Sequence, residues 1–324
     1  MLNNVVFFGT SDYCLPILES LRQNFDLKLV VTRPDKPVGR KKVLTPSATK
    51  TWAIEHKISV ITPETLKKDT QSQIGLISQI RQIHPDFAVV SDFGLIIPEA
   101  IFNLPRLGTL NIHFSKLPDL RGPSPVQFTL LRGNTKAWVT IFKLEKTLDT
   151  GPILWQKPYP IHPDDTTQTL YLRLFQETAR ILPAIINDYS PSSYHPITLK
   201  PQDHSQATFC RFLTKADGFI PWRLLQQALQ ALQAHPLQKA SIQSLPQIQQ
   251  EALQTKHHGK QISNFKFQIS NLLDFYRAMT PWPGLWTINP EGKRLLIRKC
   301  HLEENKLILD EVQFEGKKPQ KVLQ

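Results

Sequence analysis

Three polar side chains in the sequence have the types and spacing that acyl transfer requires. Asn111 and His113 stand two apart in a run typical of a strand, so both side chains point to one face of the expected sheet. Asp149 follows in the turn Leu-Asp-Thr-Gly, after the next expected strand. An amide can donate a hydrogen bond to a carbonyl oxygen that becomes negative, an imidazole can bond the same oxygen or move a proton, and a carboxylate can orient the imidazole. The sequence therefore predicts an acyl-transfer site.

Each of these residues alone has an ordinary structural explanation. A histidine near a strand end is usually a satisfied structural residue, and Asp-Thr-Gly is a common turn. Here, however, Asn-x-His is followed by a loop bounded by Pro118 and by the turn Arg121-Gly122-Pro123, and then by Leu-Asp-Thr-Gly. That combination is far more specific than its parts, and it favours a catalytic function.

The first part of the chain alternates the apolar patterns of strands and helices. We expect strands at residues 5–8, 27–31, 59–62, 87–90, 109–113 and 138–144, and helices at 15–21, 49–56, 74–83 and 166–186. This alternation predicts an α/β fold with a Rossmann-like, mostly parallel sheet that helices cover on both faces. Ligands of such sheets bind beyond the carboxyl ends of the strands, where Asn111 and His113 are expected.

The later part of the chain has a different character. Residues 191–207 are rich in Ser, Pro and His and are interpreted as a linker between a domain at 1–190 and a second at 208–324. Short strand candidates follow at 265–269, 286–288, 294–297 and 306–312, separated by turn residues. Strands of this length and spacing predict a small β-barrel.

A Gln-rich and Leu-rich insert occupies residues 223–261. A short helical hairpin and a disordered insertion both fit its composition, because Leu, Gln and Ala recur at helical spacing while Pro236 and Pro246 interrupt the pattern. The insert holds no candidate catalytic residue. We expect that a short Gly/Ser linker could replace it without loss of folding or activity.

Composition limits the class of protein. The 324 residues carry a formal net charge of +12, which suggests a polyanionic partner, although an inert basic surface would give the same charge. Cys14, Cys210 and Cys300 make no CxxC pair, which excludes a disulfide scaffold and most zinc sites and favours the cytoplasm. No apolar run reaches the roughly 18 residues that a membrane span needs, and VVFFG near the start is too short for a signal-peptide core.

Residues 32–46 are expected to form a basic loop. Three prolines and Gly39 interrupt any regular pattern there. The positive charges, which only Asp35 offsets, are Arg33, Lys36, Arg40, Lys41 and Lys42. We interpret the loop as an arm that faces phosphates, and a solvated run of charge is the alternative.

Several segments resemble the formyltransferases that use 10-formyltetrahydrofolate. The segments that carry the resemblance are VVFFGTSDYCLPIL, PDFAVVSDFGLIIP, LNIHFSKLPDLRGP, LDTG, DGFIPW, TPWPG and VQFEGKKP. Together they span nearly the whole chain outside the insert. The resemblance implies that the C-terminal barrel is OB-like and that shorter relatives, which act on glycinamide ribonucleotide, lack it.

The resemblance also implies roles for particular residues. It gives Asn111, His113 and Asp149 as the catalytic residues. Its cofactor-binding residues are Phe93, Gly94 and Leu95, in a loop whose backbone binds the pterin, and Ser115, Leu117 and Pro118 after the histidine. The basic arm would reach the acceptor stem of tRNA, chiefly through Arg40 and Lys42, and Lys293, Arg294, Arg298, Lys317 and Lys318 would extend this basic track onto the barrel. The chain departs from the family pattern at Asp92, Phe93 and Lys116, and at Pro123 and Ser124, where Arg121-Gly122-Pro123-Ser124-Pro125 replaces Arg-Gly-Ala-Ala-Pro.

The function implied by the resemblance is transfer of a formyl group to the amino group of methionine on initiator tRNA. Folate and tRNA would be the partners of a cytoplasmic, monomeric enzyme that needs neither metal nor membrane. An enzyme that formylates another amine, such as a sugar nucleotide, is the first alternative, but the second domain with a GxGxxG fingerprint that it predicts is absent. A non-catalytic RNA-binding relative is the second, and it would be expected to have lost the catalytic residues.

Overall fold

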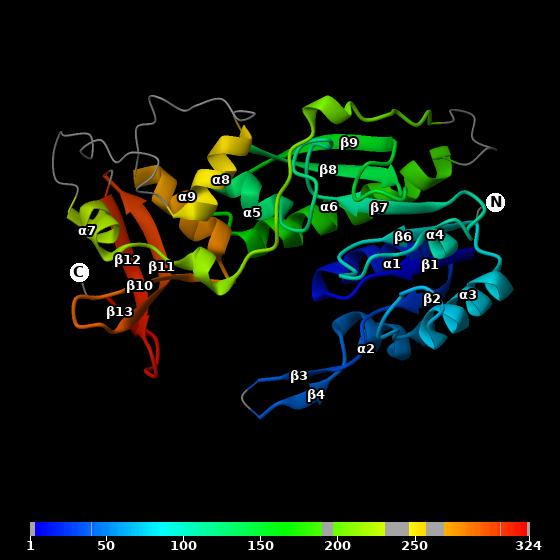
Figure 1. The fold of residues 1–324 in the computed structure, drawn as a ribbon, viewed down its shortest axis with the longest axis horizontal. Coiled ribbons are helices and arrows are strands. Elements are labelled where there is room, and N and C mark those ends of the chain that lie inside the picture. Colours follow the sequence, from blue (N-terminus) through cyan, green and yellow to red (C-terminus); the bar gives the residue numbers. More distant parts are fainter. Residues whose placement is uncertain are drawn as a thin grey trace. The chain divides into compact units, whose positions relative to one another are not determined.

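A computed structural model of the chain describes residues 4–39, 41–189, 197–230, 246–256, 269–304 and 306–322. The chain forms two compact units, drawn as ribbons in Figure 1. The first unit comprises Met1–Pro118, Trp138–Tyr159 and Tyr171–Gln206, and the second comprises Asp119–Ala137, Pro160–Leu170 and Ala207–Gln324. A division into domains at 1–190 and 208–324 with a linker between them stays a prediction.

The first unit is built on a seven-stranded sheet of order β5-β2-β1-β6-β7-β8-β9. Its strands are β1 (Asn4–Phe8), β2 (Asp26–Val31), β5 (Ser59–Ile61), β6 (Phe87–Val90), β7 (Thr109–His113), β8 (Lys136–Lys143) and β9 (Ile153–Pro160). From β5 to β7 neighbouring strands run parallel, whereas β8 runs antiparallel to β7. The predicted Rossmann-like, mostly parallel sheet is therefore confirmed.

Five described helices accompany this sheet in the sequence, and two of them begin at a side-chain cap. They are α1 (Leu15–Asn24), α2 (Ala48–Glu55), α3 (Gln71–Ile83), α4 (Glu99–Phe102) and α6 (Thr167–Tyr189). The Ser47 side chain accepts a hydrogen bond from the Lys50 amide before α2, and Thr70 accepts one from the Gln73 amide before α3. None of the helices in the described part of the chain is both long enough and apolar enough to cross a membrane.

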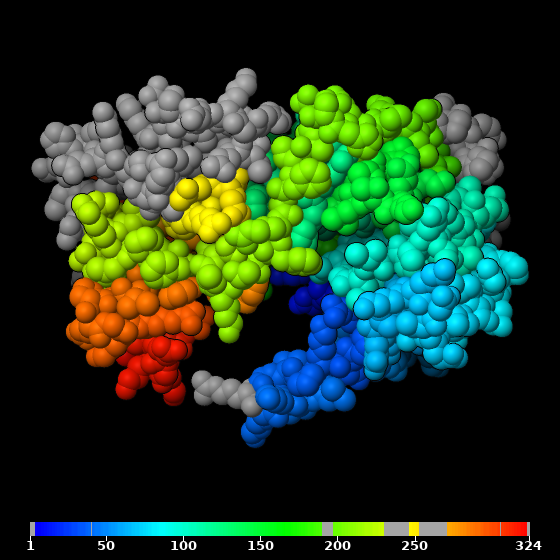
Figure 2. Space-filling view, viewed as in Figure 1, coloured from blue at the N-terminus to red at the C-terminus, as the bar shows by residue number. Residues whose placement is uncertain are grey.

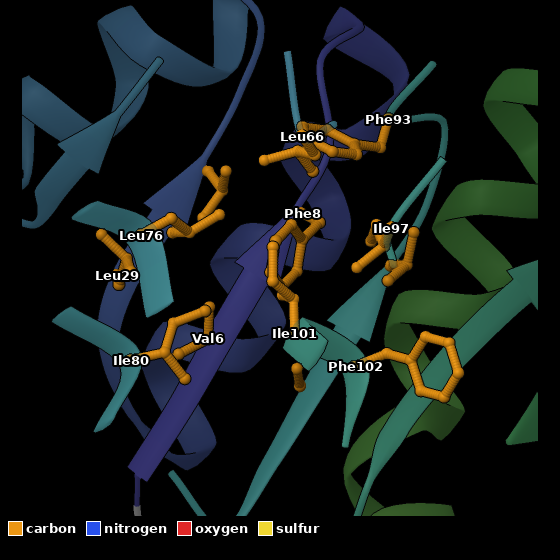
Figure 3. Packing of buried hydrophobic residues seen from close by; sticks show 13 residues of the cluster. Val6, Phe8, Leu29, Leu66, Leu76, Ile80, Phe93, Ile97, Ile101 and Phe102 are labelled. Atoms are coloured by element: carbon orange, nitrogen blue, oxygen red, sulfur yellow. The ribbon is translucent and has the colours of Figure 1, made fainter. Parts of the chain in front are cut away.

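Both faces of this sheet are covered by packed apolar side chains, because successive residues of a strand point to opposite faces. Val6 and Phe8 of β1 pack in one cluster with Leu76 of α3, as Figure 3 shows. On the opposite face of the sheet, the Phe87 ring lies 5.3 Å from the ring of Phe25, the residue that follows α1. Helices therefore cover the sheet on both faces, as predicted.

The basic segment is a β-hairpin, so its prediction as a loop was wrong. β3 (Lys36–Val38) pairs antiparallel with β4 (Val43–Thr45), and Val38 lies opposite Val43. Gly39 at the turn has φ +72°, a conformation that favours glycine. The prolines and charges of this segment are typical of a loop, so the sequence did not indicate the two short strands. Val38 and Val43 form one cross-strand pair of β-branched residues between them.

The second unit contains a four-stranded antiparallel sheet among its described residues. Its strands, in spatial order, are β10 (Leu285–Ile288), β11 (Arg294–Glu303), β12 (Lys306–Phe314) and β13 (Gln320–Lys321). The predicted C-terminal β-region is confirmed, and its closure into a barrel stays a prediction. The strand expected at 265–269 is wrong at Ile269, which begins α9 (Ile269–Met279), and its other residues lie outside the described ones.

The insert is helical wherever the structure describes it. α7 (Trp222–Gln230) buries Leu224 and Leu225, and α8 (Gln247–Lys256) buries Ile248 and Ala252. Disorder is therefore wrong for these residues, and the helical alternative is correct. Since both helices bury apolar side chains, the expectation that a linker could replace the whole insert is not supported by its packing. Residues 231–245 and 257–261 of the insert lie outside the described part.

Truncating a buried side chain of the insert should destabilise the protein. Leu225 is 0% exposed, so Leu225→Ala should lower the free energy of unfolding by about 2–5 kcal/mol. Ile288→Ala is the control, because Ile288 is 46% exposed and its truncation should change stability by about 0.5 kcal/mol or less. Urea unfolding followed by circular dichroism measures both variants. Equal midpoints for the two would show that α7 contributes nothing to the core.

Candidate active site

The carboxyl end of β7 presents Asn111 and His113. β7 lies between β6 and β8, with Asn111 beside Val90 and His113 opposite Thr140. His113 is buried and Asn111 is half-buried. No hydrogen bond joins the Asn111 side chain to another residue within the described ranges. Its amide can therefore donate to an oxygen atom of a bound substrate.

Asp149 lies next to His113, as the sequence predicts. The His113 Nδ1 atom is 3.9 Å from the Asp149 Oδ2 atom. This distance exceeds that of a hydrogen bond, so the link between the two side chains is electrostatic. Because His113 is 6% exposed and Asp149 is 5% exposed, water screens their attraction far less than it would at the surface.

A buried glutamine fixes the turn that carries Asp149. Asp149 has φ +53°, in the left-handed region. The Gln202 side chain, 7% exposed, donates from Nε2 to the Asp149 carbonyl at 3.0 Å and to the Gly151 carbonyl at 2.7 Å. Sequence reasoning missed Gln202, because it lies within the predicted linker and no local pattern links it to the turn.

Gly151 is required in this turn because the chain approaches itself closely. A Cβ atom at Gly151 would lie 1.8 Å from the Lys143 carbonyl oxygen at the end of β8. We expect Gly151→Ala to displace the turn, lower the melting temperature and reduce activity. Gly75→Ala in α3 is the matched control, since a Cβ there meets nothing within 4 Å, and alanine in a helix should add about 0.5–1 kcal/mol of stability. Thermal unfolding of the two variants should show opposite shifts.

The loop after His113 is held by hydrogen bonds to its backbone. Thr140 Oγ1 donates to the Ser115 carbonyl at 2.6 Å, and Gln156 Nε2 donates to the Leu117 carbonyl at 3.1 Å. Both Ser115 and Leu117 are buried, whereas Pro118 is half-buried. The hydrogen bonds to Ser115 and Leu117 therefore fix the buried side of the loop. Neither Thr140 nor Gln156 belongs to a motif, so the sequence did not predict them.

The loop that follows β6 offers its backbone rather than an aromatic ring. Phe93 is 3% exposed, and its ring packs edge-on against Phe8 at 5.4 Å (Figure 3). Thr10 Oγ1 donates to the Phe93 carbonyl at 3.0 Å, and Gly94 turns the chain with φ +75°. Beyond the half-buried Leu95, Ile96 is 86% exposed. A ligand at this loop would meet backbone groups and the Ile96 side chain.

Among the predicted RNA-binding cations that the structure describes, Arg33 has a different environment from the three lysines. Arg33 is half-buried, and its Nη1 atom donates to the Gly94 carbonyl at 3.4 Å, so it belongs to the loop after β6. Lys36, Lys41 and Lys42 are exposed on the hairpin. Arg40 lies outside the described residues.

The buried thiol near this loop is not a nucleophile. Burial raises the pKa of Cys14 to about 12, and its Sγ atom donates to the Ser91 carbonyl at 3.2 Å. A thiol with this pKa carries almost no thiolate at neutral pH. Asn111, His113 and Asp149 stay the predicted catalytic residues.

Comparison with known families supports an acyl-transfer site. A family model described as "Formyl transferase" matches residues 3–186. A protein of Deinococcus radiodurans named "Methionyl-tRNA formyltransferase" is 36% identical over 225 residues, which are 69% of this chain and 68% of that protein. One of the same name from Listeria monocytogenes is 32% identical over 249 residues, 76% of this chain and 77% of the relative.

Solved structures share the fold. A methionyl-tRNA formyltransferase from Clostridium thermocellum has a TM-score of 0.58 at 15% identity, covering 97% of this chain and 99% of that one. A sugar N-formyltransferase from Shewanella has a TM-score of 0.54 at 15% identity, covering 94% and 100%. At this identity the two likenesses show the fold alone and do not distinguish between amine substrates.

Proposed function

The chain belongs to the formyl transferase family, and we propose that it transfers a formyl group from 10-formyltetrahydrofolate to the amino group of methionine on initiator tRNA. The observation that carries this proposal is the buried His113–Asp149 pair, at the strand end where Asn111 also lies. The relatives at 32% and 36% identity, whose names state the methionyl-tRNA activity, indicate the acceptor.

The described residues fit a folate as the formyl donor. A flat heterocycle suits the loop after β6, where Gly94 is exposed and Ile96 offers an exposed apolar side chain. Phe93, Gly94 and Leu95 would hold the ligand through their backbone, and Ser115, Leu117 and Pro118 would shape the opposite wall. When bound, 10-formyltetrahydrofolate would supply the formyl group.

Each catalytic residue has a distinct part in the proposed reaction. The Asn111 amide would donate a hydrogen bond to the formyl oxygen, where negative charge develops as the methionine amine adds to the formyl carbon. The bond from that carbon to N10 of the folate would then break, and the proton that the amine loses would pass to N10. The His113 imidazole binds the same oxygen or moves a proton. Asp149 would orient the imidazole or order a water molecule that carries the proton, which the 3.9 Å separation permits.

The second unit is the proposed RNA-binding part, with its sheet completed as an OB-like barrel. Its basic residues named above keep that role in the proposal. Arg294 lies over the Trp286 ring at 4.3 Å, and Arg298 donates from Nε to Gln313 at 2.8 Å, so both guanidinium groups are held at defined positions. We place the enzyme in the cytoplasm, as a monomer.

Incubation with 10-formyltetrahydrofolate and charged initiator tRNA tests the function. We expect N-formylmethionine on the tRNA, detected after mild hydrolysis of the ester. Uncharged tRNA serves as one control and an amino-sugar nucleotide as another, and neither should be formylated. Turnover of the amino sugar without turnover of the tRNA would overturn the proposed acceptor but retain the family's chemistry.

A further inference from the structure

The exposed phenylalanine and tryptophan rings among the described residues belong to one of the two units. Among the described phenylalanine and tryptophan residues, only Phe209, Phe212 and Trp282 have exposed side chains, with 61%, 74% and 51% of their surface accessible. All three belong to the second unit. An apolar ring that faces water forgoes the free energy that its burial would provide. Several exposed rings in one unit therefore indicate a binding site.

The backbone around the two phenylalanines is fixed, although their rings are not covered. Phe209 pairs with Arg121 through a β-bridge, and the Cys210 amide donates to the Arg121 carbonyl at 2.8 Å. Beyond it, the Arg211 guanidinium binds the Asp217 carboxylate through two nitrogens, at 2.7 and 2.8 Å. Phe209 and Phe212 therefore protrude from an ordered segment, and a ligand need not order it on binding.

Trp282 lies beside the same segment. A Cβ atom at Gly218 would lie 3.3 Å from Pro283 Cγ and 1.9 Å from the Gly284 carbonyl oxygen, so the two stretches of chain touch. The Ile220 amide also donates to the Trp286 carbonyl at 2.8 Å. These contacts join residues 218–220 to residues 283–286, and we call the two stretches 209–220 and 282–286 together the aromatic shelf.

The charges beside the aromatic shelf favour an anionic partner. Trp286 on the shelf carries Arg294 over its ring, and its Nε1 atom donates to the carbonyl of the exposed Lys215. The nearby carboxylates Asp217 and Glu251 are both ion-paired with Arg211. Over residues 207–324 the sequence has 16 Lys and Arg against 9 Asp and Glu.

We propose that Phe209, Phe212 and Trp282 stack against unpaired nucleobases of the RNA substrate. Aromatic rings bordered by cations are the features that bind single-stranded nucleic acid, because every base has a flat face and every nucleotide a phosphate. A duplex hides these faces, so the shelf would select an unpaired segment. The inference rests on the proposed function, which supplies an RNA as the substrate.

Ring-specific substitutions test the aromatic shelf. Phe212→Leu and Trp282→Leu retain apolar bulk but remove the ring, and each should weaken binding of charged initiator tRNA by about 5- to 150-fold. Phe212→Tyr and Trp282→Phe should bind like the wild type. Because stacking releases no counterions, the slope of log affinity against log salt should not change in the leucine variants. A short single-stranded RNA should show the same losses, and a blunt RNA duplex should not.

The controls separate this inference from the proposed function. Leu172→Ala, in α6 of the first unit, removes another exposed apolar side chain and should leave tRNA affinity unchanged. Wild-type formylation of methionyl-tRNA together with unchanged tRNA affinity in both leucine variants would overturn the shelf alone. A wild-type chain that self-associates through these rings, with monomeric leucine variants of normal tRNA affinity, would also overturn it. Failure of the wild type to formylate the tRNA would instead count against the proposed function.

Discussion

His113→Ala should lower kcat for formylation by about 10²- to 10⁴-fold, the usual contribution of a positioned acid–base group. Affinity for methionyl-tRNA should stay near the wild-type value, since His113 is buried at the reacting centre and the proposed RNA contacts lie elsewhere. Asp149→Asn should cause a loss of similar order. Asparagine removes the charge but tolerates the left-handed φ of +53° at this position, so the turn can stay intact.

The measurement is single-turnover formylation at saturating folate, with tRNA binding followed separately. His204→Ala is the matched control, because His204 is exposed on the same unit. The double variant His113→Ala with Asp149→Asn should have a kcat within a few-fold of that of the slower single variant. The reason is that the effects of two residues that act as a unit on kcat are not additive. A near wild-type kcat for His113→Ala would remove the histidine from the mechanism.

Two of the three candidate catalytic residues, Asn111 and His113, could be placed from the sequence because they lie on a regular strand. The spacing of Asn111 and His113 on β7 fixes their common face. β8 runs antiparallel to β7 and ends beside Leu110, and the turn after β8 brings Asp149 to 3.9 Å from His113. The residues that hold them could not be predicted. Gln202 is 53 positions from Asp149, and this hydrogen bond forms only when the fold brings them together.

Local patterns also failed where tertiary packing determines the structure. The hairpin β3–β4 has only three residues in each strand, which is too few to show the alternation of a strand. Its prolines and glycine instead indicate a loop. The ring of Phe93 packs in the core although its neighbour Gly94 is exposed, and composition does not distinguish the two environments. For α9, the turn-rich sequence around it favoured short strands over its helical period.

Neutralising the hairpin should reduce formylation of tRNA far more than any reaction that lacks tRNA. β3 and β4 pair only with each other, and Figure 2 shows them projecting in blue from the first unit. Lys41 and Lys42 are exposed on this two-stranded ribbon, so their charges are accessible to the phosphates of the proposed tRNA substrate. Each lost phosphate contact should lower the salt slope of tRNA binding by roughly 0.7 to 0.9.

The double variant Lys41→Gln with Lys42→Gln should therefore flatten that slope by roughly 1.4 to 1.8 if both lysines contact phosphate. It should also lower kcat by up to about 10²-fold, because misplacing the methionine ester forfeits orientation at the site. Slow hydrolysis of formyl-folate, which needs only the first unit's own site, should not change. The control removes the same charge from Lys67 and Lys68, both exposed on that unit. Equal salt slopes in the two double variants would mean that the hairpin is a solvated surface, and the catalytic residues would then receive the tRNA by another route.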